Sequence, residues 1–247
     1  MTADQPRTAA ALIIGNEILS GKVHEQNVIV LARALRVLGI SLQRVVVIAD
    51  DIDTIAREVH RLAESHDVLF TSGGVGPTHD DLTIQAVAQA FDTEVEIAPG
   101  IEQMLREHFG AAVTQGHLLM ARVPKGCELV VSETIRWPTV KLRNVWVLPG
   151  VPEVFRMKLE VVTRHLTAGR PFVSRAVYTN LDEAILVPLL DRVVQGFPQV
   201  EVGSYPKWRD PEYRTKLTFD GLDSGAVDAA LEQFVRSLPE GEPQKVD

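Results

Sequence analysis

The chain has 247 residues, of which 45% are hydrophobic and 23% charged, and its formal net charge is −8 at pH 7. These values are typical of a globular protein with one large or two small domains. The negative charge argues against general binding to nucleic acid or to an anionic membrane surface. The single Cys127 excludes an internal disulfide and is typical of the cytoplasm, where we expect this protein. No apolar stretch is long enough to span a bilayer.

The first ninety residues alternate between apolar runs and helical patterns. The runs predict strands at residues 8–15, 44–49 and 67–71, and apolar spacing predicts helices at 27–38, 51–64 and 82–91. Asp51 is a good N-cap for the second of these helices. Strand–helix alternation of this kind predicts a mostly parallel sheet with helices on both faces.

The following segment is less regular. We expect a helix at 99–109, no clear element at 112–125, a hairpin of strands at 128–132 and 139–142, a strand at 144–148 and a helix at 153–167. The turn at 168–171 marks a domain boundary. Beyond it the pattern predicts a strand at 174–179, a helix at 181–195, strands at 200–205 and 213–219, and a helix at 226–238, with a frayed end at 240–247. The prediction is an α/β, three-layer αβα domain at 8–168 and a small α+β domain of the split βαβ kind at 171–239.

A glycine-rich loop follows the predicted strand at 67–71. Glycines allow the backbone to approach a phosphate closely, and the free N–H groups at the start of the next helix favour an anion there. The loop contains Gly73, Gly74 and Gly76, and then the carboxylates of Asp80 and Asp81. Carboxylate oxygens suit a hard cation such as Mg²⁺, although either aspartate alone is equally consistent with a helix N-cap.

A second strand, turn and helix start occurs at Pro149-Gly-Val-Pro-Glu153. Two such turns at one edge of a sheet predict a clamp for a single phosphate-bearing ligand. Asp50 ends another predicted strand, so it is either a ligand group at that edge or merely the strand's last residue. Glu17 and Asn27 are candidates for polar groups in the pocket, with a helix cap as the alternative for Asn27.

Three separated motifs resemble those of the MoaB/Mog-type molybdopterin-binding domain family. They are Ile14-Gly-Asn-Glu-Ile-Leu-Ser-Gly21, Ser72-Gly-Gly-Val-Gly-Pro-Thr-His-Asp-Asp-Leu-Thr83 and Leu148-Pro-Gly-Val-Pro-Glu153. Within the family, Gly76-Pro-Thr-His-Asp-Asp81 is most similar to the branch of CinA-type proteins and the N-terminal part of FAD synthases. Gly203-Ser-Tyr-Pro-Lys-Trp208 and Thr215-Lys-Leu-Thr218 resemble the second subdomain of that branch. We therefore expect a stand-alone MogA/MoaB-like module.

The resemblance implies chemistry at the phosphoanhydride of an adenine nucleotide. Mog-type members adenylylate molybdopterin with ATP and Mg²⁺, whereas the CinA and FAD synthase branch resembles pyrophosphatases that split ADP-ribose or FAD with a divalent metal such as Mg²⁺, Mn²⁺ or Co²⁺. The resemblance implies Asp50 and Asp81 as the two key carboxylates. With the residues of the loop and the pocket, we expect Asp81, Asp50 and Glu17 to be catalytic and Asp80 and Asp81 to hold the metal. The implied substrate contacts are Gly73, Gly74, Gly76, Thr78, Asn27, Gly150 and Pro152.

Three functions follow as hypotheses. The first is a metal-dependent pyrophosphatase acting on FAD or ADP-ribose-like dinucleotides, and the second is molybdopterin binding or adenylylation. The third is a non-catalytic ligand-binding protein, because Asn16 stands where the family usually has Asp and brings no negative charge for a metal. By resemblance we also expect a homo-oligomer with a small-molecule ligand. His79 is either an acid or metal ligand or an exposed loop residue, and Tyr205 and Trp208 either stack on a ring or cover the core of the small domain.

Overall fold

The computed structural model describes residues 6–133, 135–208 and 211–247. The chain divides into two compact units, of which the first ends at Gly169 and the second begins at Arg170. Within the described ranges, no helix has both the length and the apolar character needed to cross a membrane.

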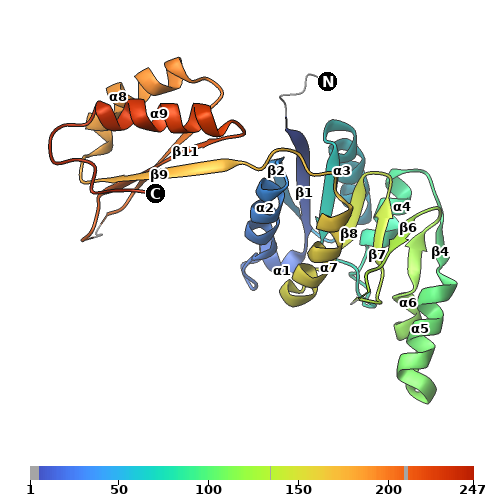
Figure 1. Cartoon of the computed structure of the whole chain (residues 1–247). Coiled ribbons are helices and arrows are strands. Elements are labelled where there is room, and N and C mark those ends of the chain that lie inside the picture. Colours follow the sequence, from blue (N-terminus) through green and yellow to red (C-terminus); the bar gives the residue numbers. More distant parts are fainter. Residues whose placement is uncertain (1–5, 134, 209–210) are drawn as a thin grey trace. The chain divides into compact units, whose positions relative to one another are not determined.

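Unit 1 is built on a six-stranded sheet with the strand order β2-β1-β3-β8-β7-β6 (Figure 1). Four neighbouring strands are parallel, namely β1 (Arg7–Ile14), β2 (Ile40–Ile48), β3 (Val68–Ser72) and β8 (Val145–Leu148). The sheet continues with two antiparallel strands, β7 (Thr139–Leu142) and β6 (Glu128–Val130). The predicted mostly parallel sheet and the predicted hairpin are confirmed.

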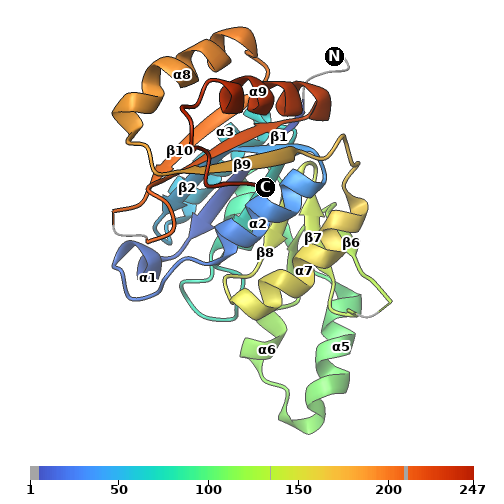
Figure 2. The same ribbon diagram turned by 60° about the vertical axis from the view of Figure 1, so that its left-hand side comes forward.

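Helices cover both faces of this sheet. Successive side chains of a strand point to opposite faces, so β1 contributes to two cores. Ala9, Ala11 and Ile13 pack with the helices α2 (Asn27–Val37) and α7 (Pro152–His165), which lie in front of the sheet in Figure 2. The alternate residues Ala10, Leu12 and Ile14 pack with α3 (Ile52–Ser65) and α4 (Thr83–Ala90). Asp51 caps α3 as predicted, because its Oδ1 accepts a hydrogen bond from the amide of Thr54 at 2.9 Å.

Several elements of unit 1 differ from the sequence prediction. The expected loop after β1 contains a short helix, α1 (Asn16–Leu19), and β2 begins at Ile40 rather than at residue 44. β2 is one of the two edge strands of this sheet, and its first half was not predicted because it contains the polar residues Ser41 and Gln43. The predicted helix at 99–109 is confirmed as α5 (Pro99–Phe109). Around it, the structure contains elements that were not predicted, namely β4 (Val95–Ile97), η1 (Gly110–Ala112), α6 (Gln115–Leu119) and β5 (Arg122–Pro124), with β4 and β5 antiparallel.

Unit 2 is a four-stranded antiparallel sheet with the order β10-β11-β9-β12, covered on one face by two helices. Its elements are β9 (Val173–Thr179), α8 (Glu183–Gly196), β10 (Glu201–Pro206), β11 (Thr215–Gly221), α9 (Ser224–Arg236) and β12 (Lys245–Val246). The predicted split βαβ fold is confirmed. The expectation of a frayed segment at 240–247 is wrong, because β12 pairs with β9. In addition, the Asp247 amide donates to the Ala176 oxygen at 2.9 Å, and the Ala176 amide donates to the Asp247 oxygen at 3.0 Å.

Candidate functional site

The two glycine turns meet at one edge of the parallel sheet. β3 and β8 are paired and parallel, so the turns that follow them leave the sheet side by side. The amide of Gly73 donates to the oxygen of Leu148 at 3.1 Å. A Cβ atom at Gly150 would lie 3.3 Å from the Cα of Gly73, so the two backbones are already in contact. Ligand sites of open α/β sheets lie at this carboxyl edge.

Only glycine fits at the start of the first turn. Gly73 has a φ of +109°, and a Cβ there would lie 2.1 Å from the backbone oxygen of Ile14. Gly74 has a φ of +64°, and its oxygen accepts from the amide of Thr83 at the beginning of α4. For the amides of Gly74, Val75 and Gly76 the hydrogen bonds among described residues include no acceptor. The turn therefore presents N–H donors that have no acceptor within the described ranges of the chain.

Asn27 fastens the two turns together. It is 2% exposed at the start of α2, and its Nδ2 donates to Ser72 Oγ at 3.0 Å and to the oxygen of Gly150 at 2.9 Å. Ser72 Oγ in turn donates to the oxygen of Pro149 at 3.3 Å. The N-cap residue of α2 is Gln26, so the helix-cap alternative for Asn27 is wrong. Its buried side chain therefore links the two turns by hydrogen bonds, and we call this its bracing role.

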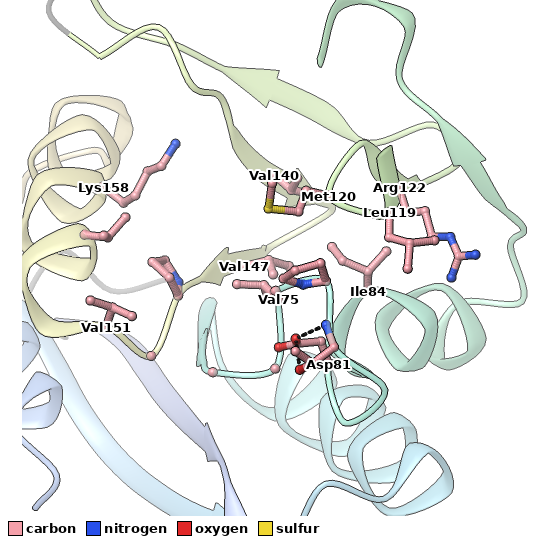
Figure 3. A pocket seen from close by; sticks show the side chains of 18 of the residues that line it. Val75, Asp81, Ile84, Leu119, Met120, Arg122, Val140, Val147, Val151 and Lys158 are labelled. Atoms are coloured by element: carbon pink, nitrogen blue, oxygen red, sulfur yellow. Dashed lines mark hydrogen bonds between the residues drawn. The ribbon is translucent and has the colours of Figure 1, made fainter. Parts of the chain in front are cut away.

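A cavity of about 600 Å³ opens beside the two turns. Ligand pockets commonly have volumes of about 300 to 1,000 Å³. Its wall includes both turns, α4, the 119–123 segment and β7, and is mostly apolar, with Val75, Ile84, Met120, Val140 and Val147 (Figure 3). Its charged lining residues, within the described ranges, are Glu17, Asp81, Arg122 and Lys158.

The paired aspartates are held by the loop, not by a helix end. The N-cap residue of α4 is Leu82, with no capping side chain, so the N-cap alternative is wrong for both. Asp81 Oδ2 accepts from the Thr78 amide at 2.8 Å, and the Thr78 hydroxyl lies 2.6 Å from Asp81 Oδ2 and 2.5 Å from Asp80 Oδ1. The contact with Thr78 lowers the pKa of Asp80. Since a hydroxyl has one hydrogen to donate, two carboxylates share one donor.

Only some of the predicted site residues line the cavity. Gly73, Gly74, Gly76, Thr78, Gly150 and Pro152 line it together with Glu17 and Asp81. Asp50, Asp80 and Asn27 do not belong to the described lining, and Asp50 Oδ2 instead accepts from the Asn16 amide at 2.8 Å. His79 is an exposed loop residue, with 97% of its side chain accessible. Tyr205 and Trp208 of unit 2 are 55% and 93% exposed, so they do not cover its core.

Sequence reasoning missed the cavity's buried polar groups away from the loop. Lys158 is 5% exposed, and its Nζ donates to the main-chain oxygens of Trp137 and Pro138, the latter at 2.8 Å. Burial lowers the pKa of Lys158 to about 8. Thr139 is 2% exposed, and its hydroxyl is without a hydrogen-bond partner in the described part of the chain. A lysine within a helical apolar pattern was the only available signal, and it is usually a solvated side chain.

The comparisons with known proteins agree with this architecture. Residues 10–168 match the family described as a probable molybdopterin binding domain. The chain belongs to this family. Residues 171–247 match the family described as the middle domain of FAD synthase. Together the two matches support the CinA and FAD synthase branch that the motifs predicted.

Two relatives and one solved structure give the extent of the similarity. A protein of Archaeoglobus fulgidus is 32% identical over 225 residues, which cover 91% of this chain and 95% of the relative. A probable FAD synthase of Caenorhabditis elegans is 30% identical over 254 residues, but they amount to only 49% of its length. The crystal structure of the protein CinA with unknown function from Thermoplasma acidophilum has a TM-score of 0.60 at 28% identity, covering 65% of this chain and 98% of that one.

Proposed function

We propose that this chain binds the diphosphate of an adenine dinucleotide, FAD or an ADP-ribose-like compound, and hydrolyses its phosphoanhydride with a divalent metal. The observation that carries the proposal is the meeting of two glycine turns on the wall of a cavity that also contains Asp81. The match to the FAD synthase middle domain supports the choice of a flavin dinucleotide. Water adds to one phosphorus, and the products are AMP and the second monophosphate, FMN or ribose 5-phosphate.

The glycine turns bind the phosphates. The unused amides of Gly74, Val75 and Gly76 donate to phosphoryl oxygens, and the absence of side chains at the glycines lets these oxygens approach. α7 begins at the other turn without a capping side chain. Its first residue, Pro152, has no N–H, so the amides of the next residues of the helix add positive potential near Gly150 and Val151. These groups stabilise the charge that increases on the phosphoryl oxygens during hydrolysis.

The donor atoms around Thr78 fit a hard cation. Two carboxylates and one hydroxyl provide only oxygen atoms as possible metal ligands. The single hydroxyl hydrogen cannot compensate the negative charges of both carboxylates. The described residues contain no group of three or more His, Cys, Asp or Glu that could hold a metal. An ion at this place would therefore need ligand phosphates and water to complete its coordination. Asp80 and Asp81 would hold it, and when bound it would neutralise phosphoryl charge. Glu17, which lines the same cavity, orients the attacking water.

The test is AMP release from FAD and from ADP-ribose, each incubated with the purified chain and with Mg²⁺, Mn²⁺ or Co²⁺. We expect metal-dependent release that falls about 100-fold or more in Asp81→Asn, which keeps the shape of the side chain but loses its charge. Asp191→Asn, at an exposed position of α8, is the matched control and should retain full activity. AMP release that is absent with every metal, or that is insensitive to Asp81→Asn, contradicts the proposal.

Molybdopterin binding or adenylylation is the second candidate, favoured by the description of the family that residues 10–168 match. It predicts ATP-dependent modification of molybdopterin with no cleavage of FAD or ADP-ribose. A third outcome, motivated by Asn16, is thermal stabilisation by a dinucleotide without turnover. In that case Asn16→Asp should create activity.

A further inference from the structure

The edge strand β2 is open along its outer side. It has 9 residues and pairs with β1 on its inner side, and no strand lies on its other side within the described ranges (Figure 1). An edge strand presents a row of unpaired N–H and C=O groups to which another strand can add. Native proteins protect such edges by keeping them short or by placing charges or proline in them.

The other edge strands of the two larger sheets are protected in these ways. β6 has 3 residues, β12 has 2, and β10 ends in Pro206. β2 is different after the bulge at Gln43, because Arg44 is followed by β-branched residues only, up to Ile48, in unbroken register with β1. Its outer edge therefore has the properties of a strand that is paired in the assembled protein.

Val45 and Val47 combine the two features that a partner strand would use. Their side chains are 41% and 38% exposed. The Ile48 oxygen accepts from the Gly15 amide at 3.1 Å, so the backbone groups of Ile48 face β1. Backbone groups alternate in direction along a strand, so those of Val45 and Val47 face outward. Apolar surface and unpaired backbone groups thus occur together on these two valines.

We propose that the outer edge of β2 binds a second copy of this chain, and that the two β2 strands pair antiparallel about a two-fold axis at Val46. In this register Val45 of each copy lies opposite Val47 of the other, and each such pair exchanges both of its N–H···O bonds. The two sheets become one continuous sheet. The inference goes beyond the proposed function and does not depend on which ligand the cavity binds.

The charges at this edge are complementary to those of a second copy. Arg44 is exposed, and the ion pairs of the described residues do not include it. In the proposed register Arg44 lies opposite Ile48 of the other copy and diagonal to its Asp50, at about 7 to 8 Å, which an arginine side chain can span. The two Arg44 residues are about 13 Å apart along the strands, so like charges do not face each other.

The size of the contact predicts its strength. Leu19 of α1 is 55% exposed and extends the apolar edge, because α1 begins beside the end of β2, where the Asn16 amide donates to Asp50. A standard interface has about 20 to 30 residues a side, so a contact built on one strand predicts a weak dimer, with a Kd of about 1 to 100 μM.

The first test is sedimentation equilibrium of the full chain from about 1 to 300 μM, which brackets this range. We expect a reversible dimer. Val45→Lys should weaken it about tenfold or more, because a charge on an edge strand opposes pairing. Val187→Lys is the matched control, since Val187 is a 52% exposed valine on α8, and it should leave the Kd unchanged.

The second test checks the register with single cysteines in a Cys127→Ser background, oxidised with diamide. Across the axis the Val46 Cα atoms form a non-hydrogen-bonded pair about 4.5 Å apart, within the range of a disulfide. Gln43 is the control on the same strand, since its two copies lie about 20 Å apart. Val46→Cys should form a covalent dimer rapidly and Gln43→Cys should not.

A chain that stays monomeric at every concentration overturns the proposal, including one whose β2 amides are protected from hydrogen exchange by another contact. A dimer that is equally tight in Val45→Lys and in Val187→Lys, or that crosslinks equally at positions 43 and 46, also overturns it. Far-UV circular dichroism checks the folding of each variant, and if Val45→Lys is unfolded, the crosslinking result decides.

Discussion

Lys158→Met should make unit 1 more stable at neutral pH, which is unusual for a substitution in a core. Burial lowers the pKa of this lysine from 10.5 to about 8. A shift of this size corresponds to about 3 kcal/mol of unfavourable free energy for the charged form in the folded state. The methionine removes that cost but leaves the oxygens of Trp137 and Pro138 without their donor, which costs about 1 to 2 kcal/mol. The net expectation at pH 7 is a stabilisation of about 1 to 2 kcal/mol.

The stability difference between Lys158→Met and the wild type should change with pH in a direction that follows from the lowered pKa of Lys158. Between pH 8 and 10.5 the unfolded chain keeps the Lys158 proton whereas the folded chain has lost it, so the unfolding free energy of the wild type rises with pH through this group. Lys158→Met lacks the group. Its advantage over the wild type should therefore fall by about 2 kcal/mol from pH 7 to pH 10 and end near or below zero.

The assay is urea unfolding at both pH values, followed by the fluorescence of Trp137 and the buried Trp146 in unit 1. Subtracting the curves of wild type and variant removes the contributions of all other titrating groups. Lys125→Met, whose ammonium is exposed and pairs with Glu94, should show a difference that does not change with pH. A destabilised Lys158→Met at pH 7, or a difference that is flat with pH, would refute the reasoning.

Three further predictions concern the contribution of Gly73, Asn27 and residues 244–247 to the stability of the two units. Gly73→Ala should lower the unfolding free energy of unit 1 by about 3 kcal/mol or more, because the new Cβ would lie 2.1 Å from the Ile14 oxygen. Gly21→Ala is the control, since Gly21 also has a positive φ but a Cβ there would meet nothing within 4 Å, and it should cost about 1 kcal/mol. Equal costs for the two variants would contradict the steric argument. Asn27→Ala should cost about 2 kcal/mol and Asn27→Asp more, since a carboxylate would face the Gly150 oxygen; the reverse order in urea unfolding would refute the bracing role. Removal of residues 244–247 should destabilise unit 2 by about 1 to 2 kcal/mol, measured by hydrogen exchange at Ala176, and unchanged exchange there would show that β12 contributes nothing.

Much of the fold was predictable because its signals are local. The strands β1, β3 and β8 are buried on both faces and read as apolar runs, and Asp51 caps α3 through a neighbour three residues away. The edge strand β2 was only half recognised, because its exposed side needs no apolar residues. β12 escaped prediction because its two residues become a strand only by pairing with β9, a contact distant in the sequence.

The candidate site was predictable in part for the same reason. The glycine turns and the paired aspartates are contiguous in the sequence, so their residue types and spacing identified them. The role of Asn27 as a brace depends on Gly150, 123 positions away, and no local pattern encodes it. Lys158 and Thr139 were missed because their burial comes from the tertiary structure and not from their neighbours in the sequence. The catalytic and metal roles of Asp81, Asp80, Glu17 and Asp50 remain predictions.

The most direct test of the central claim is a crystal structure of the chain soaked with Mg²⁺ and an ADP-ribose analogue that cannot be hydrolysed, because a methylene group replaces the oxygen between its two phosphorus atoms. The account predicts the diphosphate beside the two glycine turns, with phosphoryl oxygens within hydrogen-bond distance of the amides of Gly74 and Gly76 and a cation at Asp81. A diphosphate bound away from these turns, with the cavity beside them empty, would contradict it.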